Sequence, residues 1–342
     1  MNRRPLLALL MTGVAATACS GSSTPAAQLA APSRSPSASA SPSPSPSPKP
    51  PALNPLTGVG PVPTTPVVVV KVDNGGLARP YHRGLGRAAV VYQELVESGE
   101  TRFAAVYTDA STGEVGPVRS LRESDIELLR QYGKVPVAFS GANAGIKALM
   151  ASAVRSGYLL DASYDTVPQD YRLAERRRDA RNFFTTTAAV AASRPGAPAR
   201  DIGFRFGALP PGSGTPTNVA RAVYSNFVTV TLRYVPSSGR WSVTQNKRLM
   251  PGVAPANVVV QQVPIRTTRF VDVLGHPTPY TTTVGSGGAT VLRDGRAIKA
   301  RWRRLSPDTG TRYLDAAGKD VPLKPGPTWV LLLPQGRPLT LS

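Results

Sequence analysis

The hydrophobic pattern of the first half of the chain alternates between strand-like and helix-like segments. Residues 66–73 (PVVVVKVD) form a continuous β-branched run, which is typical of a buried strand. Ala144–Arg155 is alanine-rich and has the length of a helix. Further strand candidates, the first of which also fits a helix, are Ala88–Val96, Thr101–Tyr107 and Val135–Phe139. This alternation predicts an α/β domain, with a mixed sheet and flanking helices, over residues 54–210.

A second helix in this half is predicted to begin at Ser120. Ser120 and Glu123 fit the Ser-x-x-Glu capping box, in which each side chain satisfies a free backbone N–H group. The apolar face of this helix would comprise Leu121, Leu128, Leu129 and Tyr132. Asp125 falls on the same face, which favours an internal partner for its carboxylate.

The second half has strand patterns and almost no helical periodicity. The runs 227–235 and 240–246 flank a Ser-Ser-Gly turn and predict a hairpin. Asp294-Gly295 is a strong type I′ turn signal between two alternating stretches. Further strands are predicted at 257–263, 289–302 and 328–334, with Ile298, Ala300 and Trp302 on one face. We therefore expect a small, mainly-β domain over residues 215–342.

The N-terminus has the order of a secretory signal over residues 1–18. Arg3 and Arg4 precede a short apolar run, and small residues then lead to Cys19. The run is too short to span a bilayer as a helix. Residues 16–19 (Ala-Thr-Ala-Cys) resemble the lipobox of bacterial lipoproteins, with Ala where Leu is usual. Since Cys19 is the only cysteine, we expect it to carry the lipid; a plain signal peptide with an incidental cysteine is the alternative.

A Ser-Pro-rich segment follows over residues 19–53. Its composition offers nothing from which to build a core, and proline favours an extended, solvated backbone. At about 3.1 Å per residue, such a tether could reach up to about 90 Å from a membrane. The segment is predicted to be either a tether that lifts the folded part into the wall or a spacer of no fixed length.

The charge balance narrows the expected partners. The chain has 40 Lys and Arg against 20 Asp and Glu, a formal charge of +20, which becomes +18 when Arg3 and Arg4 leave with the signal. A strongly basic surface favours polyanions. Because an exported protein does not meet nucleic acid, we expect a membrane contact through the lipid anchor and an anionic wall polymer or peptidoglycan as partner. The oligomeric state stays open.

Several motifs resemble the YerB-like bacterial lipoproteins, domain-of-unknown-function family 3048. The similar stretches are NPLTG (54–58), Asp73-Asn74, Arg79-Pro80, 91–107, GPVRSLR (116–122), 285–302 and 323–334. In ARNFFTTT (180–187), Arg181 stands where the family pattern has His. The resemblance covers residues 54–334. It implies a two-part architecture and an extracytoplasmic address, and it carries no established activity.

Acidic residues gather in the first half and are interleaved with arginines. Nine of the 20 acidic residues lie between Asp73 and Glu127. A guanidinium group offers paired, planar donors that suit carboxylate or phosphate. The candidate ligand-binding residues are Asp73, Asn74, Arg79, Glu94, Glu97, Arg102, Arg119, Arg122 and Asn182. They either bind an anionic ligand or glycan, or pair with one another as a structural network.

Two functions compete on these residues. The leading hypothesis is a non-enzymatic binding or scaffolding module for anionic cell-envelope components. The alternative is an envelope hydrolase, with Asp73 or Glu94 as general base and Arg102 or Arg119 stabilising an anion.

Metal and cofactor chemistry finds little support in the sequence. The two histidines, His82 and His276, are far apart and lack ligand spacing. Ca²⁺ or Mg²⁺ at Asp73, Glu94 and Glu97 is opposed by the surrounding arginines. We therefore predict no metal site and no cofactor.

Overall fold

The computed structural model describes residues 52–174 and 183–342. The chain divides into two compact units, Met1–Lys49 and Pro50–Ser342, and every described residue belongs to the second. The predictions for the signal, Cys19, Asn182 and all but the end of the tether lie outside the described residues. Within the described ranges, no helix has the length and apolar character needed to cross a bilayer.

The first part of the fold alternates strands and helices, as the sequence predicts. Its strands are β1 (Val68–Asp73), β2 (Val90–Leu95), β3 (Thr101–Tyr107), β4 (Glu114–Val118), β5 (Val135–Ala138), β6 (Leu159–Asp161), β7 (Tyr171–Leu173) and β8 (Phe183–Thr186). Its α-helices are α1 (Glu123–Leu129), α2 (Ala144–Arg155) and α3 (Thr187–Ser193). Short 3₁₀ helices are η1 (Arg79–Tyr81), η2 (Leu85–Arg87), η3 (Glu97–Gly99), η4 (Arg130–Tyr132) and η5 (Pro168–Asp170).

Helix α1 begins three residues later than predicted. The backbone is still extended at Arg122 (φ −116°, ψ 161°), and the N–H of Leu121 donates to the carbonyl of Gly141 at 3.1 Å, so residues 120–122 do not form a helical turn. Asp125, and not Glu123, supplies the capping carboxylate, because its Oδ2 accepts from the N–H of Arg122 at 2.7 Å. The predicted Ser120–Glu123 capping box is therefore wrong.

The second part is mainly β, as predicted. Its strands are β9 (Thr215–Pro216), β10 (Val219–Val223), β11 (Thr229–Val235), β12 (Arg240–Gln245), β13 (Arg248–Leu249), β14 (Asn257–Val263), β15 (Ile265–Val271), β16 (Pro277–Thr281), β17 (Gly285–Arg293), β18 (Arg296–Arg304), β19 (Arg312–Leu314), β20 (Thr328–Pro334) and β21 (Leu339–Leu341). Both predicted hairpins form: β11 pairs with β12, and β17 pairs with β18 across Asp294-Gly295.

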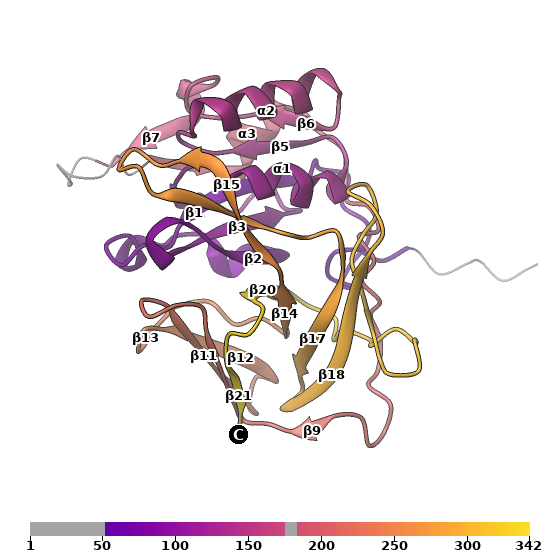
Figure 1. The fold of residues 1–342 in the computed structure, drawn as a ribbon. Coiled ribbons are helices and arrows are strands. Elements are labelled where there is room, and N and C mark those ends of the chain that lie inside the picture. Colours follow the sequence, from indigo (N-terminus) through magenta and orange to yellow (C-terminus); the bar gives the residue numbers. More distant parts are fainter. Residues whose placement is uncertain (1–51, 175–182) are drawn as a thin grey trace, which may run out of the picture. The chain divides into compact units, whose positions relative to one another are not determined.

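A single large sheet contains strands from both parts (Figure 1). In the described part of the chain it has 14 strands, and its main order is β19-β18-β17-β14-β20-β2-β3-β1-β4-β8-β7. The junction is the parallel pairing of β2 with β20, from Val90 opposite Thr328 to Gln93 opposite Leu331. The segments 54–210 and 215–342 thus share backbone hydrogen bonds.

The part of the large sheet around β1 is buried on both faces. Val69 of β1 faces the cluster that contains Leu128 of α1 and Met150 of α2. Val70 faces the opposite cluster, which includes Trp241 of a five-stranded sheet ordered β13-β12-β11-β10-β21. Burial on both sides explains the unbroken apolar run of β1.

A separate two-stranded hairpin, β15–β16, leaves the large sheet between β14 and β17 (Figure 1). It contacts α1, β2 and η3 of the first part. The ring of Phe270 fills the space beside Gly145, where an added Cβ would lie 2.2 Å from Phe270 Cε1. The hairpin therefore brings side chains of the second part onto the first.

Candidate functional site

A large cavity lies where β1 and β3, the segment before α1, the loop before α2 and the β15–β16 hairpin meet. Its volume is about 930 Å³, within the range of small-molecule sites. We call it the cleft. Its charged lining residues are Asp73, Glu97, Glu100, Arg102, Arg119, Arg122 and Asp272. Apolar side chains, among them Leu77, Val96, Ile146, Val271 and Val273, complete the walls.

Asp73 joins two of the cleft arginines. It ends β1, where the antiparallel register places it opposite Arg102 of β3. Its Oδ1 lies 3.0 Å from the Nη1 of Arg102, and its Oδ2 accepts from the Nε of Arg119 at 2.8 Å. Burial tends to raise the pKa of Asp73, but the two guanidinium groups outweigh it and hold that pKa below its usual value. Asp73 is therefore an ionised anchor that orients both arginines.

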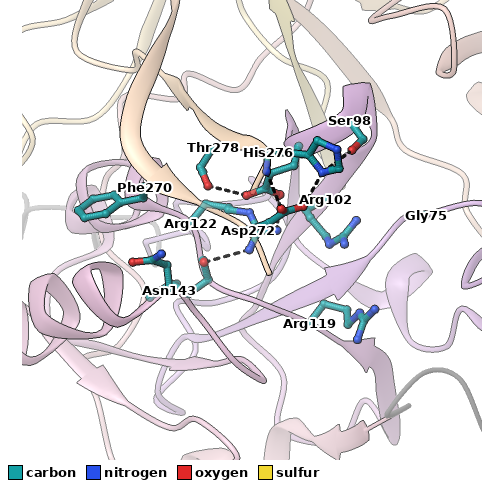
Figure 2. A network of polar contacts seen from close by, with 12 residues as sticks. Gly75, Ser98, Arg102, Arg119, Arg122, Asn143, Phe270, Asp272, His276 and Thr278 are labelled. Carbon is teal, nitrogen blue, oxygen red and sulfur yellow. Dashed lines mark hydrogen bonds and ion pairs between the residues drawn. The ribbon is translucent and has the colours of Figure 1, made fainter. Parts of the chain in front are cut away.

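Arg122 is held by a second carboxylate, that of Glu97 in η3. The Nη2 of Arg122 donates to the Oε2 of Glu97 at 2.5 Å. The hydroxyl of Thr278 donates to the other oxygen at 2.7 Å, from the β15–β16 hairpin. Figure 2 shows Thr278 and Arg122 close together, with Asp272 and His276 of the same hairpin nearby. The second part of the chain thus helps to fix an arginine of the first.

Arg119 keeps donors free for a ligand. Its Nε bonds to Asp73, whereas its two terminal nitrogens have no hydrogen-bond partner among the described residues. Its side chain is 33% exposed, compared with 14% for Arg102. The carbonyl of Arg119 accepts from the N–H of Ser140, so the segment after β4 that carries Arg119 runs beside the loop leading to the N-terminus of α2. A helix N-terminus favours an anion at the same place.

Glu94 lies behind the cleft in a buried ionic trio with Lys71 and Asp125. Lys71 donates to Glu94 and, at 2.5 Å, to the Oδ1 of Asp125, and all three side chains are at most 1% exposed. The hydroxyl of Ser124 donates to the second oxygen of Glu94 at 2.8 Å. Burial raises the pKa of Glu94, but Lys71 reverses that effect and the net pKa is lowered. Burial and the charge of Glu94 raise the pKa of Asp125 to about 7.

Two other predicted site residues lie away from the cleft lining. Arg79 donates to Glu100 at 3.0 Å and to the carbonyl of Asn74 at 3.1 Å. Asn74 is fully buried, and its amide donates to Thr101 at 2.7 Å. Asn182 lies outside the described residues. The structure therefore brings together five of the predicted residues: Asp73, Glu97, Arg102, Arg119 and Arg122.

The sequence-based prediction missed Lys71 and the hairpin residues. A lone lysine inside the run VVVVKV is a usable signal, because a buried ammonium group requires carboxylate partners. Thr278 and Asp272 carried no such signal. They reach the cleft only because the hairpin crosses onto the first part.

The two carboxylates considered as general bases, Asp73 and Glu94, have no free oxygen in this structure. A general base needs a pKa near the working pH and a free oxygen, whereas both oxygens of Asp73 face guanidinium groups. Glu94 is enclosed with Lys71. Among the described residues, no group of three or more His, Cys, Asp or Glu side chains is placed to hold a metal ion.

Comparison with known proteins identifies the family. Residues 56–200 match the model described as "Protein of unknown function (DUF3048) N-terminal domain", and residues 220–330 match its C-terminal counterpart. The chain belongs to this family. It is 26% identical, over 294 residues, to "Putative lipoprotein YerB" of Bacillus subtilis (strain 168), covering 79% of this chain and 81% of that protein.

The fold is shared with a solved structure. The crystal structure of the YerB protein from Bacillus subtilis superimposes with a TM-score of 0.69 at 20% identity. The match covers 84% of this chain and 99% of the YerB chain. The resemblance stated from the sequence motifs is thereby confirmed, and so is the predicted fold class of a mixed sheet followed by a mainly-β part.

Proposed function

We propose that this protein is a lipid-anchored, extracytoplasmic binding protein whose cleft holds an anionic component of the cell envelope. The address follows from the order of charged, apolar and small residues before Cys19, and the lipoprotein description of the Bacillus relative supports it. The observation that carries the binding proposal is Arg119. Its terminal nitrogens lack partners among the described residues, in an open cleft where Asp73 fixes its orientation.

The mixed charge of the cleft lining limits the kinds of ligand that it can bind. Three arginines line it, but so do Asp73, Glu97, Glu100 and Asp272, so the lining has no excess of positive charge. A ligand with a carboxylate beside amide and hydroxyl groups suits this lining better than a densely charged polymer. Soluble peptidoglycan fragments have this chemistry, and their methyl groups suit the apolar walls.

Isothermal titration of residues 50–342, which form a compact unit of their own, tests the proposal with soluble peptidoglycan fragments. Arg119→Gln should weaken binding by about tenfold or more, because a hydrogen bond to a charged group contributes about 1.5–3 kcal/mol. The matched control is Arg87→Gln, which removes an exposed arginine paired with Asp109 and should leave affinity unchanged. Equal affinities for the two variants, or no binding by the wild type, would contradict the proposal.

A further inference from the structure

A row of three exposed cations on β18 has no role in the cleft. The strand reads RAIKARWRR, and its alternation turns Lys299, Arg301 and Arg303 to solvent while Ile298 and Trp302 face the core. Because two residues advance a strand by about 6.6 Å, the three charges repeat along one line at that interval. We call these three residues the β18 row.

The β18 row is unpaired, unlike the arginines of the cleft. Among residues 52–174 and 183–342, none of its three side chains forms an ion pair or a side-chain hydrogen bond, whereas Arg102, Arg119 and Arg122 each face a carboxylate. Exposed cations need no partner, because water solvates them. Their donors are therefore available to a ligand without breaking an internal contact.

The strand on one side of the row adds no charge and little bulk. In β17, Thr290 lies opposite Lys299, Gly288 opposite Arg301 and Ser286 opposite Arg303. Facing residues in this register point to the same side of the sheet. Small neighbours leave the row open along its length.

The strand on the other side extends the positive charge at one end only. In β19, Leu314 lies opposite Arg301 and Arg312 lies opposite Arg303. Arg312 already holds Asp320 through two hydrogen bonds, at 2.9 and 2.6 Å. Asp320 is thus paired with Arg312 and does not neutralise the β18 row. The unpaired cations remain the three residues of that row.

We propose that the β18 row binds a linear, phosphodiester-linked polyanion of the cell envelope. Evenly spaced unpaired cations complement anionic groups repeated along a chain, and a guanidinium fork can take two oxygens of one phosphate. A line one strand wide fits an extended polymer better than the plane of a lipid bilayer. This site lies beyond the proposed cleft function and depends on it only for the extracytoplasmic address.

The test measures binding of residues 50–342 to fluorescently labelled poly(glycerol phosphate) over a series of salt concentrations. The variant carries Lys299→Gln, Arg301→Gln and Arg303→Gln. Each cation that neutralises a phosphate releases counterions and adds about 0.7–0.9 to the slope of log K against log salt. Loss of the row should therefore reduce that slope by about 2–3 and weaken binding at least tenfold at low salt.

The matched control removes three exposed arginines that are likewise unpaired among the described residues, from β10, β11 and β13. Arg221→Gln, Arg233→Gln and Arg248→Gln produce the same change in net charge on the five-stranded sheet. This variant should keep the wild-type slope. A charge-keeping variant, Arg301→Lys with Arg303→Lys, should also keep it, because the slope counts charges. Thermal unfolding of all variants should match the wild type, since the replaced side chains are exposed.

Three results would overturn the proposal. The first is an equal loss of polymer binding in the row variant and in the charge-matched control. The second is no binding of the polymer by the wild type. The third is a row variant that loses binding to anionic vesicles or single-stranded nucleic acid more than to the polymer. Arg119→Gln should leave polymer binding intact, so failure of the cleft proposal and failure of this one give different results.

Discussion

The arginines of the cleft and the cations of the β18 row show two ways in which this basic protein holds charge. Arg102 is 14% exposed and Arg122 is 10% exposed, and each sits against a carboxylate that offsets its lost hydration. Lys299, Arg301 and Arg303 are exposed, and none is paired among the described residues. The cleft arginines are therefore largely neutralised by neighbouring carboxylates, whereas the row is free to contribute to long-range attraction of an anion.

The sharpest test of this comparison replaces a buried charge and an exposed one by the same residue. Lys71→Met leaves Glu94 and Asp125 buried together without their cation, and should cost about 3–5 kcal/mol of unfolding free energy. Lys299→Met should change it by less than about 0.5 kcal/mol. Urea denaturation of residues 50–342 at neutral pH measures both. Similar losses of unfolding free energy in the two variants would contradict the distinction between the buried, paired charge and the exposed, unpaired one.

The second prediction concerns pH. The pKa of Asp125 is about 7 in the folded state and about 3.9 in an unfolded chain, so the folded state retains a proton that the unfolded state has released. This contribution to stability is complete below about pH 4 and is lost as the pH rises through 7.

Asp125→Asn should remove this contribution. The difference in unfolding free energy, wild type minus variant, should fall as the pH is raised from 4 to 8 in urea titrations. The control Asp165→Asn, at the exposed pair with Lys147, should leave the wild-type pH profile in place. A wild-type profile that survives Asp125→Asn would show that this carboxyl does not titrate in the trio.

The third prediction compares the stability lost when either of two arginine-paired aspartates, Asp73 or Asp320, is replaced. Asp73→Asn leaves Arg102 and Arg119 without their shared charge, and should cost about 1–3 kcal/mol. Asp320→Asn removes the more exposed partner of Arg312 and should cost about 0–1 kcal/mol. Chemical denaturation of the two variants ranks them, and a larger loss for Asp320→Asn would reverse the argument.

The smallest expected effect on stability is at Gly145, where Phe270 of the β15–β16 hairpin packs against α2. Gly145→Ala forces the ring of Phe270 to shift, at about 1–3 kcal/mol of overpacking, and a gain of up to about 1 kcal/mol in helix propensity partly offsets this. Binding of peptidoglycan fragments in the cleft should weaken, while polymer binding at the β18 row should not change. The control is Gly207→Ala, whose added Cβ meets Pro322 at an ordinary 3.8 Å. If both glycine variants behave alike in the two binding assays, the hairpin does not shape the cleft.

Local patterns predicted most of the elements. Local sequence patterns are sufficient for three of them: strand β1, helix α2 with its predicted bounds, and the hairpin at Asp294-Gly295. The start of α1 did not, because Leu121 is held by a hydrogen bond to Gly141 in the loop before α2 and the backbone stays extended up to Arg122. A capping motif can be read only where the backbone is free to become helical.

Long-range pairing also limited what could be predicted about the site. The clustering of Asp73, Arg102 and Arg119 follows from acids and arginines at strand ends. The parallel pairing of β2 with β20 has no local signal, and it draws the two halves into one sheet. Glu94 was predicted for the ligand, and the register places it opposite Arg102 as it does Asp73. Its two oxygens are nevertheless taken by Lys71 and by Ser124 of α1, contacts that have no local signal in the sequence.

The hairpin β15–β16 leaves and rejoins the large sheet at adjacent strands, since Gln261 of β14 pairs with Ala289 of β17. Its length and tip can change without altering the register of either flanking strand. Among its own residues, Val271, Asp272, Val273 and Thr278 line the cleft. One wall of the cleft can therefore change in size and chemistry through this single insertion, while the strands of the large sheet stay as they are.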